Sequence, residues 1–378
     1  MENQITRYLK STIFNKIGKN KVILLLGTRR VGKTWLIDEI TKEAKVEYLS
    51  LNGEDQDVQA LLATRTIANY KRILGSAKLL VIDEAQVIPE VGKILKLLID
   101  SFKDLTIIAS GSSAFDLSNQ TGEPLTGRSL TYYLYPIAQI ELAPYENGLQ
   151  TAQNIEERLI FGAYPELFQL DSLPEKAQYL TELIKSYLLK DILMYENIQN
   201  STKLFDLLKL IAFQVGSEVS IDELSRTLGI SKNTVDRYLD LLAKVFIIYK
   251  VSGYSNNLRK EVTKSSKWYF YDNGIRNAII NDFRLLALRN DQGILWENYC
   301  FAERIKKMSY QQQNVQHYFW RTYDQQEIDL IETKDGQVMA VDFKWGDAKK
   351  KIPRFFSRNY PNASFLIINK ENYIDFIL

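Results

Sequence analysis

The most constraining feature of the chain is a glycine-containing turn between an apolar run and a helical segment. The run Val22–Leu26 is followed directly by Gly27-Thr-Arg-Arg-Val-Gly32-Lys33-Thr34, which has the spacing G-x-x-x-x-G-K-T. This order predicts a buried strand, a loop and a helix, which is the repeating unit of a parallel sheet. The glycines let the backbone fold around an anion, and the first amides of the helix point at the same place.

The loop therefore predicts a site for nucleotide phosphates and Mg²⁺. Lys33 would reach the β- and γ-phosphates, and the Thr34 hydroxyl would be a ligand of Mg²⁺. Backbone amides between residues 29 and 34 would face the phosphate oxygens. The predicted cofactor-binding residues in the loop are Gly27, Thr28, Arg29, Arg30, Val31, Gly32, Lys33 and Thr34.

Two other apolar runs end in polar residues. Leu79–Ile82 is followed by Asp83 and Glu84, and the carboxyl ends of strands are where open α/β sheets bind ligands. Asp83 would hold the metal through water, and Glu84 would polarise the attacking water as a general base. The run Leu105–Ala109 ends at Ser110, whose hydroxyl would bond the γ-phosphate or the water.

Arg128 follows Gly127 just before the apolar run Thr131–Tyr135. It offers a cation for transition-state charge, in its own subunit or toward a neighbouring one. An ordinary surface arginine explains the same position equally well.

In sequence order, these motifs resemble the AAA+ ATPase core found in bacterial and archaeal proteins. The matching stretches are GTRRVGKT (27–34), LLVIDEAQ (79–86), IIASGSS (107–113) and LTGRSLTYYLYPI (125–137). Four later stretches, 161–166, 187–191, 268–274 and 296–298, resemble the uncharacterised domain that usually follows that core. The resemblance implies ATP binding and hydrolysis with Mg²⁺, with Ser110 in the polar sensor position and Arg128 as the arginine of a Gly-Arg motif.

The fold predicted for the first 150 residues is α/β, with a parallel sheet between helices. Five apolar runs are interpreted as buried strands: Val22–Leu26, Val46–Leu51, Leu79–Ile82, Leu105–Ala109 and Thr131–Tyr135. Helical segments such as 34–44 and 90–102 separate most of them, which is typical of a parallel sheet covered on both faces.

Residues 220–239 have the pattern of a helix-turn-helix. Ser220 and Glu223 predict a capping box, Gly229 suits the turn, and Ser231 would cap the second helix. The residues expected on the face that enters a major groove are Lys232, Asn233, Thr234 and Arg237. Residues 220–264 contain 8 basic and 5 acidic residues, a net charge of +3. Because that excess is small, a packing module without DNA contact remains an alternative.

Carboxylates and a lysine gather near the C-terminus. Asp335-Gly336 predicts a hairpin turn, and this turn would bring Asp329 beside Asp342 and Lys344. The pattern resembles the restriction-endonuclease-like family, whose acids hold Mg²⁺ while a lysine supports the attacking water or the phosphate. By this resemblance, the nuclease-like residues are Glu297 (the acid on a helix), Asp329, Asp342 and Lys344. An inactive remnant that only binds is the alternative.

Composition narrows the chemistry. The chain has 48 Lys and Arg against 46 Asp and Glu, so its net charge of +2 excludes attachment to nucleic acid by bulk charge alone. One Cys and one His exclude an intramolecular disulfide and Cys-rich or His-cluster metal sites. The apolar runs are too short to span a bilayer. We therefore expect no membrane partner and a cytoplasmic location.

These inferences divide the 378 residues into four parts. They are an AAA+ P-loop ATPase core (1–150), a helical lid or linker (151–215), a winged-helix-like module (216–265) and a small endonuclease-like α+β or α/β domain (266–378). Two functions stay open: ATP hydrolysis coupled to DNA binding or processing, and a nucleotide-dependent switch whose C-terminal half only binds a partner. The expected partners are ATP and DNA, together with a second copy of the chain or another protein.

Overall fold

The computed structural model describes residues 5–111, 125–185, 201–255, 266–322, 324–346 and 351–378. The chain divides into two compact units, one of residues 1–135 with 244–246 and one of residues 136–243 with 247–378. The sequence placed the first boundary at residue 150, whereas the change of unit falls between Tyr135 and Pro136. Apart from residues 244–246, the three later parts predicted from sequence lie in one unit, and the last two of them contribute strands to one sheet.

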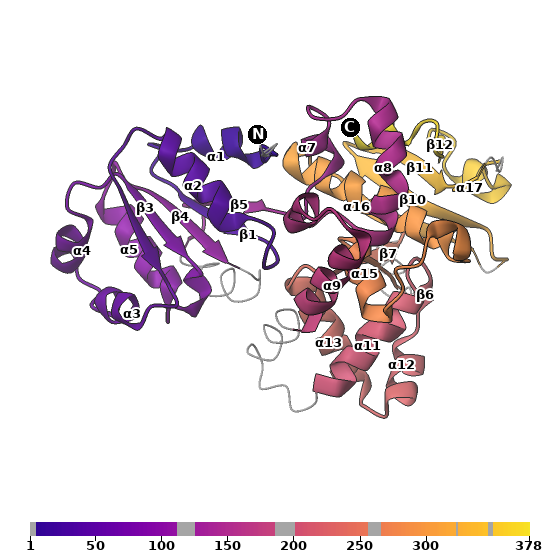
Figure 1. The fold of residues 1–378 in the computed structure, drawn as a ribbon, viewed down its shortest axis with the longest axis horizontal. Helices are drawn as coiled ribbons and strands as arrows, with labels where there is room; N and C mark the ends of the chain where they lie inside the picture. Colours follow the sequence, from indigo (N-terminus) through magenta and orange to yellow (C-terminus); the bar gives the residue numbers. More distant parts are fainter. Residues whose placement is uncertain (1–4, 112–124, 186–200, 256–265, 323, 347–350) are drawn as a thin grey trace. The chain divides into compact units, whose positions relative to one another are not determined.

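The first unit is built on a five-stranded sheet in the order β2-β3-β4-β1-β5, with every pair parallel. Its strands are β1 (Val22–Leu26), β2 (Tyr48–Asn52), β3 (Leu79–Asp83), β4 (Thr106–Gly111) and β5 (Ser129–Tyr133). Its described helices are α1 (Leu9–Phe14), α2 (Lys33–Glu43), α3 (Gln56–Ala63), α4 (Ile67–Leu74), the short η1 (Ala85–Val87) and α5 (Val91–Ser101). The predicted α/β class with a parallel sheet is confirmed (Figure 1).

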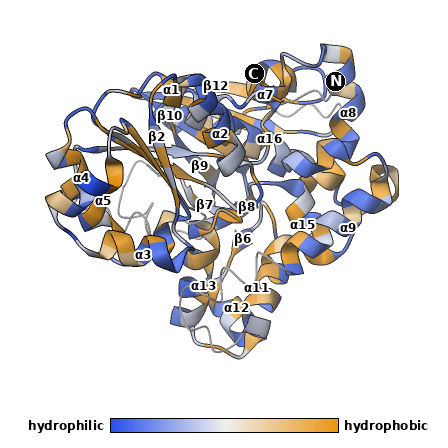
Figure 2. Ribbon diagram, turned by 60° about the vertical axis from the view of Figure 1, so that its left-hand side comes forward, coloured by the Kyte–Doolittle hydropathy of each residue, from blue (hydrophilic) through white to orange (hydrophobic). Residues whose placement is uncertain are grey.

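Burial in this sheet follows strand position. All residues of β1 and β4 are buried, because these strands lie inside the sheet with helices such as α2 and α5 packed on β4. Figure 2 shows apolar colour along the strands, while α4 and α5 carry both apolar and polar residues. The sequence analysis predicted a buried strand at Val46–Leu51. A strand forms there, but the prediction that it is buried is wrong. The strand β2 lies at the sheet edge, and its residues are exposed or half-buried.

The second unit has a seven-stranded sheet in the order β12-β11-β10-β9-β7-β8-β6. Its strands are β6 (Glu218–Val219), β7 (Ile248–Gly253), β8 (Ser266–Phe270), β9 (Gln316–Arg321), β10 (Glu327–Lys334), β11 (Gln337–Phe343) and β12 (Ser364–Ile368). The pairs β7–β9 and β11–β12 are parallel and the other four are antiparallel. One continuous sheet therefore includes strands from both the predicted winged-helix module and the predicted C-terminal domain.

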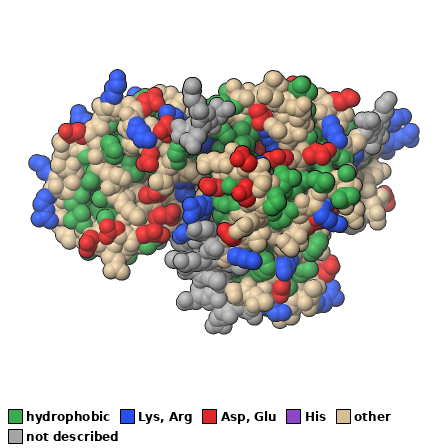
Figure 3. All heavy atoms as spheres, viewed as in Figure 1, with side chains coloured by type: hydrophobic (Ala, Val, Ile, Leu, Met, Phe, Trp, Pro, Cys, Tyr) green, Lys and Arg blue, Asp and Glu red, His purple; other side chains and the backbone are tan. Residues whose placement is uncertain are grey.

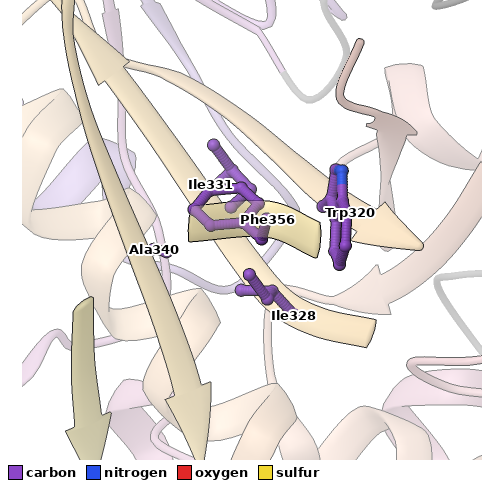
Figure 4. Close-up of a cluster of buried hydrophobic side chains, with 5 residues drawn as sticks. All are labelled: Trp320, Ile328, Ile331, Ala340 and Phe356. Carbon is purple, nitrogen blue, oxygen red and sulfur yellow. The ribbon is translucent and has the colours of Figure 1, made fainter. Parts of the chain in front are cut away.

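Helices cover this sheet and form the rest of the unit. They are α7 (Gln139–Leu142), α8 (Gly148–Phe161), η2 (Pro165–Gln169), α9 (Leu173–Leu183), α11 (Ser201–Phe213), α12 (Ile221–Leu228), α13 (Lys232–Lys244), α15 (Asn273–Ile280), η4 (Leu286–Leu288), α16 (Gln292–Tyr310), α17 (Arg354–Asn359) and α18 (Tyr373–Ile377). The helix α16 contacts both β8 and β11. A small apolar cluster lies between α17, which contributes Phe356, and the strands β9, β10 and β11 (Figure 4). It consists of Trp320, Ile328, Ile331, Ala340 and Phe356.

Candidate functional site

The glycine loop joins β1 to α2 and is held close to the backbone that follows β5. A Cβ atom on Gly27 would lie 2.1 Å from the carbonyl oxygen of Leu134, so only glycine fits there. Arg30 has φ 64° and Gly32 has φ 91°, both in the left-handed region. The two positive φ angles turn the chain sharply before α2 begins at Lys33.

Lys33 is buried, and its ammonium group lies within the loop. Its Nζ donates to the carbonyl oxygens of Gly27 at 2.8 Å and Thr28 at 2.9 Å. Two other residues of the loop are fixed by their surroundings. Val31 is fully buried, and Arg29 forms an ion pair with Glu54 at 3.8 Å. The loop is thus folded around a lysine in the sequence position that contacts phosphates in P-loop proteins.

The polar carboxyl ends of two strands, β3 and β4, meet the start of α2 beside this loop. The Thr34 hydroxyl donates to Asp83 Oδ2 at 2.7 Å, and the Ser110 hydroxyl donates to Asp83 Oδ1. The backbone amide of Glu84 donates to the same Oδ1 at 3.1 Å. Thr34, Asp83, Glu84 and Ser110, predicted from three separate motifs, therefore lie in one hydrogen-bonded group. Its hydroxyl and carboxylate oxygens are the ligand type that Mg²⁺ prefers, so the residues fit that ion.

Glu84 is held in an unusual backbone conformation. Its φ of 48° and ψ of 42° are left-handed, which is uncommon for a residue with a side chain. Gly53 packs against this turn, since a Cβ there would lie 2.4 Å from the carbonyl oxygen of Glu84. The side-chain amide of Gln86 donates to Glu84 Oε2 at 2.5 Å. The strained backbone and the amide together set the direction of the carboxylate.

Arg128 is separated from the loop within its own subunit. It precedes Ser129, which pairs with Val22 at the amino end of β1, whereas the loop follows the carboxyl end. Four strand rises of ~3.3 Å place the two ends roughly 13 Å apart. Arg128 Nε also donates to Asp100 at 2.7 Å. A role in its own site is not supported by this placement, and a role toward a neighbouring subunit stays a prediction.

The helix-turn-helix residues form α12 and α13. Ser220 accepts the amide of Glu223, Gly229 ends α12 at φ 66°, and Ser231 accepts the amide of Thr234. Lys232, Asn233 and Arg237 are exposed and Thr234 is half-buried. The strands β6, β7 and β8 of this module belong to the seven-stranded sheet, and its residues 256–265 lie outside the described residues.

The C-terminal hairpin forms as predicted, with Lys334 opposite Gln337 and positive φ at Asp335 and Gly336. The pairing of Leu330 with Val341 makes Asp329 and Asp342 neighbours. A register shift between Ile328 and Ile331 places Asp329 at a bulge in β10. Asp329 Oδ2 accepts the amide of Phe343 at 2.9 Å and lies 3.8 Å from Lys344 Nζ.

A lysine missed in the sequence sits among the acids. Lys267, on β8, is 1% exposed and forms an ion pair with Glu327. Burial alone would lower the pKa of Lys267, but Glu297, Glu327 and Asp329 outweigh it and hold that pKa above 10.5. We call Lys267 with these three acids the Lys267 cluster. The sequence analysis missed Lys267 because β8 contains polar and apolar residues, and nothing in this pattern indicated that the lysine side chain would be buried.

Glu297 is the most perturbed acid of this cluster. Burial and the neighbouring Asp329 raise its pKa to about 8, and the Tyr269 hydroxyl donates to Glu297 Oε1 at 2.7 Å. Within the described part of the chain, no three Asp, Glu, His or Cys side chains are grouped so that they could hold a metal ion. The cation that lies beside Glu297, Glu327 and Asp329 in the structure is the ammonium group of Lys267.

Three of the stretches that resemble the uncharacterised domain pack against one another; the fourth, 187–191, lies outside the described residues. The Asp272 carboxylate accepts the amide of Ala163 at 2.8 Å. Asn298 donates to Asn273 Oδ1 at 2.6 Å, and Asn273 donates to the carbonyl of Leu159 at 3.3 Å. These residues join α8, α15 and α16, so their role in the described structure is to hold the second unit together.

Comparison with known protein families matches three successive segments of the chain. Residues 19–143 match the family model of an AAA domain. Residues 152–286 match a domain of unknown function (DUF8612), and residues 292–376 match another (DUF4143). No helix in the described ranges is long and apolar enough to cross a membrane.

Several known proteins are similar to this chain along most of its length. An uncharacterized protein of Mycobacterium tuberculosis is 26% identical over 331 residues, covering 85% of this chain and 70% of that protein. One from Methanocaldococcus jannaschii is 23% identical, covering 89% and 78%. Among solved structures, the RuvB Holliday junction branch migration motor of Thermotoga maritima aligns with TM-score 0.34 and 17% identity, over 65% of this chain and 89% of that one. The chain is therefore similar to an AAA domain over residues 19–143 and to two domains of unknown function over residues 152–286 and 292–376.

Proposed function

We propose that the AAA domain binds ATP with Mg²⁺ and hydrolyses it. The observation that carries this proposal is the hydrogen-bonded group of Thr34, Asp83, Glu84 and Ser110 next to Lys33. Bound Mg²⁺ would neutralise phosphate charge, with Thr34 and Asp83 as the residues that hold it. Lys33 would exchange the loop carbonyls for phosphate oxygens. Glu84, aligned by Gln86, would orient the attacking water and accept its proton.

The test separates binding from hydrolysis. The Lys33→Ala variant should lose nucleotide binding, because the ammonium group that faces the phosphates is removed. The Glu84→Gln variant should bind ATP but hydrolyse it at least a hundredfold more slowly, since it lacks the general base. Lys93→Ala, at an exposed lysine of α5, is the matched control and should behave as wild type. Normal hydrolysis in both site variants would exclude this proposal.

We further propose that the helix-turn-helix acts in DNA binding coupled to this ATPase. The exposed Lys232, Asn233 and Arg237 at the start of α13 support a winged-helix assignment with a groove-facing helix. On the face in Figure 3, however, basic and acidic side chains are interspersed. Because the net positive charge is low, few phosphates would be neutralised, and the binding should depend only modestly on salt concentration. A change of Lys232 and Arg237 to alanine should abolish it, whereas equal DNA binding by this variant would favour the packing module.

For the C-terminal residues, the Lys267 cluster favours binding over cleavage. Its cation is a lysine, and burial together with the neighbouring Asp329 favours the uncharged form of the Glu297 carboxyl. Incubation of the protein with DNA and Mg²⁺, with and without ATP, tests this. Cleavage that disappears in Asp342→Ala and Lys344→Ala would restore the nuclease assignment. If no nucleic acid binds at all, the protein is a nucleotide-dependent switch for a protein partner. The cytoplasmic location and a homo-oligomer stay predictions.

A further inference from the structure

Arg7 is a buried arginine that contacts the phosphate loop from outside the motif. It lies just before α1 and is 2% exposed. Its Nη1 donates to the carbonyl oxygen of Val31, and its Nη2 donates to that of Tyr135 at 2.7 Å. One guanidinium group therefore bonds two backbone carbonyls that are 104 positions apart in the sequence.

The first of these bonds orients the loop. In a trans peptide the carbonyl and the next N–H point in opposite directions. Because Arg7 binds the carbonyl of Val31, the N–H of Gly32 is turned away from the guanidinium and toward the inside of the loop. An ideal Cβ on Gly32 would lie 3.6 Å from Arg7 Nη1, so the group lies directly against this peptide. Arg7 thus holds the last turn before Lys33 in the direction that an anion requires.

The second bond reaches the end of the first unit. Tyr135 is the last residue of that unit before the chain passes to Pro136. Its neighbour Leu134 donates its amide to Leu26 at 2.7 Å, and the Leu134 carbonyl packs against Gly27. Both ends of the loop, Gly27 and Val31, are therefore in contact with residues 134–135, directly or through Arg7.

We propose that Arg7 is a positioning residue that couples the nucleotide state of the phosphate loop to the segment Leu134–Ile137, where the chain leaves the first unit. This inference rests on the proposed function of the loop. When nucleotide binding rotates the Val31–Gly32 peptide, the carbonyl oxygen that Arg7 Nη1 binds changes position. Because the guanidinium is planar and rigid, Nη2 moves together with Nη1, and its hydrogen bond to the carbonyl of Tyr135 changes as well. A lysine has the charge but lacks the planar fork.

The experiment compares wild type with Arg7→Gln and Arg7→Lys, with Arg72→Lys as a matched control at an exposed arginine. Each protein is measured with and without the non-hydrolysable ATP analogue AMPPNP and Mg²⁺. The readouts are the dissociation constant, the thermal stability, and the hydrogen exchange of the amides of Leu134, Tyr135 and Ile137. In wild type, nucleotide should slow exchange there.

We expect Arg7→Gln to weaken binding about tenfold, the size of one lost charge-assisted hydrogen bond. Both Arg7 variants should lose the nucleotide-dependent change at 134–137. If binding weakens but that change persists, Arg7 only supports the loop, and the coupling is overturned. Wild-type behaviour in both variants overturns it as well. If Arg7→Gln does not fold, Arg7→Lys gives the same decision. Failure of the ATPase assignment would show separately, because wild type would then not bind AMPPNP.

Discussion

The Lys267 cluster makes a quantitative prediction about charge in the interior of the second unit. Replacing Lys267 with methionine keeps a flexible side chain of similar length, which would still pack on the Phe319 ring that lies 5.2 Å from the ammonium group. The variant removes the cation but leaves Glu297, Glu327 and Asp329 in place. The side chain of Lys267 is 1% exposed, whereas that of Glu327 is 29% exposed.

The size of the effect follows from this burial. Removing one partner of a fully buried ion pair costs about 3–5 kcal/mol, because the other charge stays uncompensated. Water reaches Glu327, so we expect the lower end, about 3 kcal/mol at pH 8. Without the cation, the ionised carboxylates that remain around position 267 are less stable in the folded state, whereas their protonated forms are little affected. The added loss is therefore small near pH 4.5, where unfolded glutamates bind protons, and grows as the pH rises toward 8.

Urea unfolding followed by tryptophan fluorescence measures this change. Four of the five tryptophans lie in the second unit, at positions 268, 296, 320 and 345. The free energy of unfolding is compared at pH 5 and pH 8 for wild type, Lys267→Met and Lys334→Met, an exposed control on β10. A loss below about 1 kcal/mol, or an equal loss at both pH values, would refute the electrostatic reasoning. Stabilisation of Lys267→Met alone by Mg²⁺ would mean that the lysine takes the place of a metal.

Two other predictions concern the same unit. Since Glu297 has a folded pKa of about 8 against an ordinary 4.5, it lowers wild-type stability as the pH rises between these values, by up to about 1.4 kcal/mol per pH unit. Glu297→Gln should remove this pH dependence and raise the melting temperature at pH 8, and a curve parallel to wild type would contradict the burial argument. Gly274→Ala would place a Cβ 1.9 Å from the Phe161 carbonyl oxygen, so we expect a loss of about 1–3 kcal/mol in urea unfolding. Its control, Gly293→Ala on α16, has open space around it and should gain a few tenths to about 1 kcal/mol.

Much of the AAA domain could be predicted from sequence because its signals are local. Interior parallel strands are continuous apolar runs, so β1 and β3 were found to within one residue. The loop is specified by glycines whose positive φ or close packing is needed wherever the fold occurs. The partly exposed edge strands β2 and β5 were harder, since an edge position depends on the order of strands in space. That order is set by long-range packing, which leaves no periodic signal.

The residues missed at both sites share one property. Arg7, Gln86 and Lys267 are polar side chains that act on a neighbouring group, and the sequence patterns predicted a role for none of them. Arg7 and Lys267 have ordinary sequence surroundings, and only the folded chain shows that Arg7 contacts Val31 or that Lys267 contacts Glu327. Likewise, Arg128 follows a glycine that the sequence analysis recognised. The register of β5 against β1 places Arg128 at the amino end of these strands, whereas the loop follows the carboxyl end of β1.

The second unit shows why recognisable motifs there do not reveal an activity. Gly162, Asp272, Gly274 and Asn298 join α8, α15 and α16 through contacts too close or too buried to tolerate other side chains. Such positions keep their residue types for reasons of packing, so a resemblance carried by them identifies a fold. Binding, by contrast, depends on residues that the core leaves exposed, such as Lys232 and Arg237 on α13. Because β7 pairs with β8 on one side and β9 on the other, this module and the Lys267 cluster share one sheet. A change at either is therefore expected to alter the stability of the other, and the activity of the second unit must be sought in both together.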